Sequence, residues 1–107
     1  MKIIAVKINI TYPLLPTICA TKRAWNLDLK KCKKYDYVVG VSEKQIKGVY
    51  KLIDVFKDCI DPKRVEFILC PCTPVEEFVI KNEIYKNPEK INLSFNGPTM
   101  YIDDFSL

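Results

Sequence analysis

The sequence predicts a single α+β domain, a small curved mixed sheet or open β-barrel of about five strands with two helices. Segments with a two-residue hydrophobic period, typical of strands, alternate along the chain with two short helical patterns. The 107 residues suffice for one hydrophobic core. Because 49% of the residues are hydrophobic, the chain carries enough apolar surface to fold. The expected order of elements is β-α-β-β-β-α-β, and a sheet of this size most readily curves into a partly open barrel.

The first strand is expected over residues 2–10, where apolar and polar side chains alternate and predict one buried face. Two prolines in the following TYPLLPT exclude strand and helix, so we expect a loop. Asp28 is expected to cap a short amphipathic helix in DLKKCKKY, with lysines on its exposed side. The two faces of the first strand are expected to carry Ile4, Val6, Ile8 and Ile10 on the buried side and Ala5, Lys7 and Asn9 on the other.

A β-hairpin is expected next, because YDYVVGV and QIKGVYKL are both rich in strand-forming residues and are separated by the polar SEK. The following IDVF is predicted to form one helical turn, and KDCIDPKR a polar loop. RVEFILCP is expected to form the fourth strand, with Val65, Phe67 and Leu69 on one face. After a turn at NGP, TMYIDDF is expected to form the last strand.

TPVEEF is the strongest local signal in the chain. Thr73 and Glu76 form a capping box, and Pro74 occupies the first helical position. The sequence therefore predicts that a helix begins here. The apolar residues that follow at helical spacing are expected to pack this helix on the sheet: Val75, Phe78 and Val79.

Charge is divided unevenly along the chain. Residues 1–51 hold 11 Lys and Arg against 3 Asp and Glu, a net charge of +8, whereas residues 52–107 have a net charge of −4. A basic half of this kind attracts anions, although a solvated lysine-rich surface is the alternative interpretation. Five cysteines without a secretory or membrane-spanning segment predict free or buried thiols in a cytoplasmic protein.

No catalytic or metal site is expected. The sequence has no histidine, which removes the commonest general base and metal ligand, and the CPC spacing of Cys70 and Cys72 is too short for a zinc half-site. Adjacent carboxylates, as in Glu76 with Glu77, point apart in a helix or strand and do not form an acid–base pair. We therefore expect a non-catalytic protein without a cofactor. An enzyme that acts on nucleotides through a carboxylate or a cysteine is the alternative.

CATKRAWNLDLKKC, residues 19–32, holds the only tryptophan next to Lys22 and Arg23. An indole face can stack on a base, and neighbouring cations can contact phosphate, so the segment suits a planar anionic ligand. Because tryptophan is usually mostly buried, a core position for Trp25 is the alternative. Replacing Trp25 should lower ligand affinity if the indole lines the site, and should lower the free energy of unfolding if the indole is in the core.

Six blocks of the sequence occur in an order that resembles the C-terminal domain of GIY-YIG-endonuclease-like proteins: VKINITY, ATKRAW, YDYVVGV, IKGVYKL, RVEF and NGPTMYI. The likeness spans residues 3–102 but lacks the nuclease half, so it implies no endonuclease activity. Where that family has Arg-Gly, this chain has Lys22 and Arg23. The succession of elements is also similar to the PUA, ASCH and EVE barrels, which implies a cleft for a nucleobase, nucleotide or RNA.

We predict a non-catalytic binder of a small nucleotide-like anion, such as a viral protein that sequesters a host immune signalling nucleotide in the host cytoplasm. One alternative is a PUA-like nucleic-acid-binding module. Another is a protein inhibitor of a host enzyme, with an acidic face of Glu76, Glu77, Glu83, Asp103 and Asp104. Exposed strand edges are compatible with a homodimer, and no membrane partner is expected. The expected ligand-binding residues are Asn9, Thr21, Lys22, Arg23, Trp25, Tyr50, Arg64 and Glu66.

Overall fold

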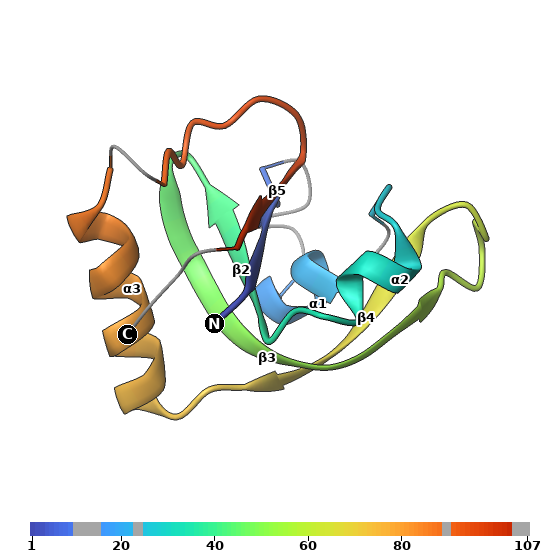
Figure 1. Ribbon diagram of the computed structural model, residues 1–107, viewed down its shortest axis with the longest axis horizontal. Helices are drawn as coiled ribbons and strands as arrows, with labels where there is room; N and C mark the ends of the chain where they lie inside the picture. Colours follow the sequence, from blue (N-terminus) through green and yellow to red (C-terminus); the bar gives the residue numbers. More distant parts are fainter. Residues whose placement is uncertain (10–15, 23–24, 89–90, 104–107) are drawn as a thin grey trace.

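The computed structural model describes residues 1–9, 16–22, 25–88 and 91–103. A curved five-stranded mixed sheet, in the order β4-β3-β2-β1-β5, forms its centre with three helices beside it (Figure 1). The α+β class and the five strands are as predicted, and the sheet remains open. The strands are β1 (Ile3–Lys7), β2 (Tyr37–Ser42), β3 (Gln45–Lys57), β4 (Val65–Pro71) and β5 (Thr99–Ile102). The helices are α1 (Thr17–Lys22), α2 (Leu29–Cys32) and α3 (Pro74–Lys86).

Helix α1 was not predicted, and it raises the number of described helices from the expected two to three. It begins at Thr17, directly after Pro16, whose carbonyl accepts a hydrogen bond from the Ala20 N–H at 3.0 Å. Proline is compatible with the start of a helix, because the first turn leaves its N–H groups without partners inside the helix. Most of the predicted loop, residues 11–15, and the end of the predicted first strand, Ile10, lie outside the described residues.

Strand β1 is buried on both faces, so the prediction of a single buried face is wrong. It pairs in parallel with β2 and antiparallel with β5, and therefore lies inside the sheet. Ile3 and Ala5 pack with the residues that face α3, whereas Ile4 and Val6 pack on the side of α1 and α2. All four side chains are fully buried. Helices on both faces of the sheet exclude water from both sides of its inner strands.

The hairpin and the fourth strand are confirmed, but the helical turn predicted over residues 53–56 is wrong. These residues continue β3, which pairs with β4 along most of its second half. The pairing register shifts between Leu52 and Asp54, which marks a β-bulge at Ile53. The two-residue turn between β2 and β3 has positive φ at both Glu43 and Lys44, as a tight hairpin of this twist requires.

Helix α3 begins at the predicted capping box but turns a different face to the sheet. The Thr73 hydroxyl accepts from the Glu76 N–H, and the Glu76 carboxylate accepts from the Thr73 N–H, both at 3.2 Å. Val75 and Phe78, expected against the sheet, are 73% and 66% exposed. The expected packing of these residues, and of the exposed Val79, is therefore wrong.

The orientation of α3 follows from contacts that Glu76 makes with the sheet. Its carboxylate lies 3.3 Å from the Lys51 ammonium and accepts a hydrogen bond from the Tyr37 hydroxyl at 3.1 Å. Residues four positions apart lie on one face of a helix, so Ile80 and Ile84 point to the sheet with Glu76 and are buried. Hydrogen bonds, first from the Thr73 backbone, lower the pKa of the Glu76 carboxyl, so it stays ionised for this contact.

Candidate functional site

Trp25 lies in the core and not at an open hollow, which corrects the position expected for its indole. The side chain is 9% exposed and belongs to the core on the side of α1 and α2. Its indole N–H donates to the Thr21 carbonyl at 2.7 Å, and its backbone exchanges two hydrogen bonds with Val65. Because protein side chains surround the indole, no ring face is available for a base. The core interpretation of Trp25 therefore holds.

Among the described residues, the expected ligand-binding set also includes a buried threonine and two residues at opposite ends of β3. Thr21 is fully buried, and its hydroxyl donates to the Thr17 carbonyl at 2.7 Å. Asn9 accepts a hydrogen bond from the Glu43 N–H at 3.0 Å, beside the turn that precedes β3. Arg64 lies at the other end of β3, in the loop before β4, where its Nε is 3.3 Å from Asp61. A 13-residue strand separates these two ends, so Asn9 and Arg64 do not share a ligand.

Three of the other expected residues lie on three different elements. Tyr50 is buried on β3, and Glu66 is half-buried on β4. Lys22 is half-buried at the end of α1, whereas Arg23 lies outside the described residues. The described part of this residue set therefore includes buried side chains and extends to both ends of the 13-residue strand β3.

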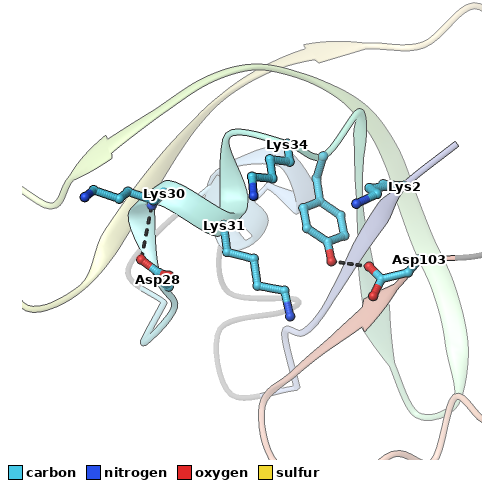
Figure 2. A pocket seen from close by; sticks show the side chains of 7 residues that line it. Lys2, Asp28, Lys30, Lys31, Lys34 and Asp103 are labelled. Carbon is cyan, nitrogen blue, oxygen red and sulfur yellow. Dashed lines mark hydrogen bonds between the residues drawn. The ribbon is translucent and has the colours of Figure 1, made fainter.

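Lysines from separate segments meet instead at a pocket of about 330 Å³ beside α2 (Figure 2). This volume is at the lower end of the range for small-ligand sites. Figure 2 shows Lys2, Lys31 and Lys34 around a tyrosine ring, with Lys30 pointing away from it. We call this site the lysine pocket; it is lined by Lys2, Asp28, Lys30, Lys31, Lys34, Tyr35 and Asp103.

Local sequence explains why α2 presents its lysines to solvent. Asp28 caps the helix as predicted, because its carboxylate accepts from the Lys30 N–H at 3.2 Å. Cys32 is the buried residue of this short helix, which leaves the flanking lysines on the outside. Lys2 is held at the pocket rim because its backbone N–H donates to the Asp36 carboxylate at 3.0 Å, and its carbonyl accepts from the Asp36 N–H at 2.8 Å.

Two tyrosines support the lysine side chains. The Tyr35 and Tyr101 ring centres are 4.9 Å apart, and the Tyr35 hydroxyl donates to the Asp103 carboxylate. The Lys2 ammonium lies 5.5 Å from the Tyr35 ring centre, and the Lys31 ammonium lies 4.0 Å from that of Tyr101. These cation–π contacts hold two positive charges beside adjoining rings. The rings therefore position cations at the pocket.

The pocket carries an excess of positive charge at neutral pH. Its lining includes four lysines, three of them directed to its centre, and two carboxylates, Asp28 and Asp103. Burial raises the pKa of the Tyr101 hydroxyl to about 12, and burial and then Asp103 raise the pKa of Tyr35, so both hydroxyls stay neutral. Because Tyr35 is only 5% exposed, its ring face is not open to a base. The arrangement is suited to recognising negative charge.

The acidic face expected for an inhibitor is largely neutralised among the described residues. Glu76 pairs with Lys51, and Glu77 pairs with Lys81 at 3.3 Å. Asp103 lies in the lysine pocket instead of on an acidic surface. Asp104 lies outside the described residues. Glu83 is half-buried on α3. Of the described members of the expected acidic face, two are therefore paired with lysines and one lies in the lysine pocket.

Sequence reasoning missed the lysine pocket as a site, although part of its signal is local. The run LKKCKK surrounds one buried cysteine with four lysines and was assigned to an amphipathic helix. Lys2 and Asp103 come from opposite ends of the chain. They meet because β1 pairs with β5, with Ile3 opposite Ile102. No pattern of neighbouring residues in the sequence indicates that β1 pairs with β5.

All five cysteines are free thiols. Burial raises the pKa of the Cys72 thiol to about 11 and also raises that of Cys32, which favours the unreactive protonated form. Within the described ranges, no group of three or more His, Cys, Asp or Glu residues could hold a metal ion. The described helices include none long and apolar enough to cross a membrane.

No protein-family model, curated protein or solved structure matches this chain. The resemblance to the C-terminal domain of GIY-YIG-endonuclease-like proteins and to PUA-like barrels therefore stays a prediction. The function is accordingly argued from the lysine pocket itself.

Proposed function

We propose that this protein is a non-catalytic binder of phosphorylated, nucleotide-like anions, which it holds by their phosphates in the lysine pocket. The observation that carries this proposal is the meeting of three lysines from the N-terminus, α2 and the turn after it: Lys2, Lys31 and Lys34. Lysine is a compact point charge suited to phosphate oxygens, and charge-assisted hydrogen bonds to anions are the strong ones. Recognition thus runs through the phosphates, with Trp25 as part of the core.

The chemistry of the pocket favours binding over catalysis. Its tyrosine hydroxyl is a neutral donor with a raised pKa, and the carboxylates of Asp28 and Asp103 each already accept a hydrogen bond. A general base is most effective when its pKa lies near the working pH. A protein that binds its ligand without changing it removes that ligand in proportion to the number of binding sites. Sequestration of a host signalling nucleotide by a viral protein is the use that we propose for such a binder.

Titration with inorganic triphosphate tests the proposal, because this anion carries the charge of a nucleotide tail without a base. We expect binding that weakens with added salt, and we expect Lys34→Ala to weaken it about fivefold, or ~1 kcal/mol. The matched control is Lys86→Ala, which removes an exposed lysine at the end of α3 on the opposite face of the sheet. Calorimetry on both variants measures the difference. Equal losses in the two variants, or no binding by the unmodified protein, would contradict the proposal.

A further inference from the structure

Two further hollows adjoin the lysine pocket, and Tyr35 lines all three. The larger, of about 500 Å³, is bounded by Met1, Lys51 and Ile53 among others. The smaller, of about 230 Å³, is bounded by Lys33 and Ile53 among others. The lysine pocket is therefore one part of a longer depressed surface around Tyr35.

Ile53 lines both of the additional hollows and stands between them. The β-bulge at this position adds a residue to β3 and turns the Ile53 side chain outward, where it is 61% exposed, while Val55 stays in the core. Met1 adds a second exposed apolar side chain to the larger hollow. The packing of the core does not require the Ile53 side chain, which lies exposed at the bulge beside the hollow next to the lysine pocket.

The hollows that Ile53 lines carry charges of both signs, since Asp54 accompanies a lysine in the smaller and Asp36 accompanies one in the larger. Lys34 lines the lysine pocket, and its sequence neighbour Lys33 lines the smaller hollow. A single phosphate tail in the lysine pocket would leave Lys33 and Ile53 without a contact to the ligand. A ligand with several phosphates and an exposed ring system between them would contact both the lysines and Ile53.

We propose, resting on the function proposed above, that the same surface also binds single-stranded nucleic acid. Its phosphates lie along Lys34, Lys2 and Lys33, and one unstacked base packs against Ile53. Isoleucine is among the apolar side chains that proteins insert between the base steps of a duplex, so an isoleucine can pack against a base face. Single strands expose their bases for such contacts, whereas a duplex keeps them stacked. The phosphates supply most of the affinity, and the Ile53 contact adds a part that inorganic phosphate cannot reproduce.

Fluorescence anisotropy with a labelled oligothymidylate of about 12 nucleotides tests this inference, in parallel with inorganic triphosphate. We expect Ile53→Ala to weaken oligothymidylate binding about five- to tenfold and to leave triphosphate binding unchanged. The control is Ile60→Ala, which removes an isoleucine that is 77% exposed in the loop before β4, and which should alter neither affinity. Ile53→Leu retains an apolar side chain and should restore most of the oligothymidylate affinity.

The outcomes separate the two proposals. Oligothymidylate binding that is unaffected by Ile53→Ala, or duplex DNA binding as tight as single-strand binding, would overturn the single-strand inference and leave the phosphate site standing. If the unmodified protein does not bind triphosphate, the proposed function is overturned instead. Equal effects of Ile53→Ala and Ile60→Ala on oligothymidylate would also overturn the role of Ile53.

Discussion

Replacing Trp25 by alanine should lower the free energy of unfolding by about 3–5 kcal/mol, the usual loss when a large buried aromatic side chain is truncated. The indole packs in the core beside α1 and β4, and its N–H donates to the Thr21 carbonyl. Alanine would leave a cavity and an unpaired carbonyl. Urea denaturation followed by circular dichroism measures the change.

The same variant separates a core role from a binding role. We expect the folded fraction of Trp25→Ala to bind inorganic triphosphate as the unmodified protein does, because Trp25 does not line the lysine pocket. If the alanine variant does not fold, Trp25→Phe retains much of the volume and should lose about 1 kcal/mol with unchanged binding. Unchanged stability together with lost binding would place the indole at the ligand.

Reversing two charges in the lysine pocket should have the largest effect on binding. We expect Lys31→Glu combined with Lys34→Glu to weaken triphosphate binding about 100-fold, because two attractions become repulsions and like charges in contact cost several kcal/mol. Neither lysine is buried, so we expect the double variant to fold. Calorimetry at constant ionic strength measures the loss, since salt screens such charges.

A matched double variant distinguishes the pocket from the overall charge. Lys63→Glu combined with Lys86→Glu changes the net charge equally, at two exposed lysines outside the lysine pocket, and should weaken binding only a few-fold. Asp103→Asn is the opposite change within the pocket and should strengthen triphosphate binding a few-fold. Similar losses in both double variants would mean that the anion responds to net charge and not to this site.

Much of the fold was predictable because its signals are local. The hairpin, the fourth strand and the capping box at Thr73 each follow from residues adjacent in sequence. The orientation of α3 was not predictable, because two sets of apolar residues have helical spacing: Val75 with Phe78, and Ile80 with Ile84. The contact of Glu76 with Lys51, which decides between these faces, joins distant segments. In the same way, the two buried faces of β1 depend on helices elsewhere in the chain.

Only the basic character of the candidate site, and not its position, was predictable from the sequence. The excess of lysines in the first half of the chain predicts a basic surface, whereas the sequence places the site around Trp25 and not at the lysines that follow it. A tryptophan flanked by cations has the same appearance in sequence whether its indole is in the core or at a ligand. The pairing of β1 with β5 completes the lysine pocket, and this pairing depends on the folded topology.

The most direct test of the central claim is a titration of the nitrogen-15-labelled protein with inorganic triphosphate, followed by the shifts of its backbone amide resonances. We expect the shifts to be concentrated at Lys2, residues 30–35 and Asp103, with the Trp25 indole resonance unchanged. Shifts concentrated at residues 21–25 and at the indole, with the lysine pocket unaffected, would contradict the account.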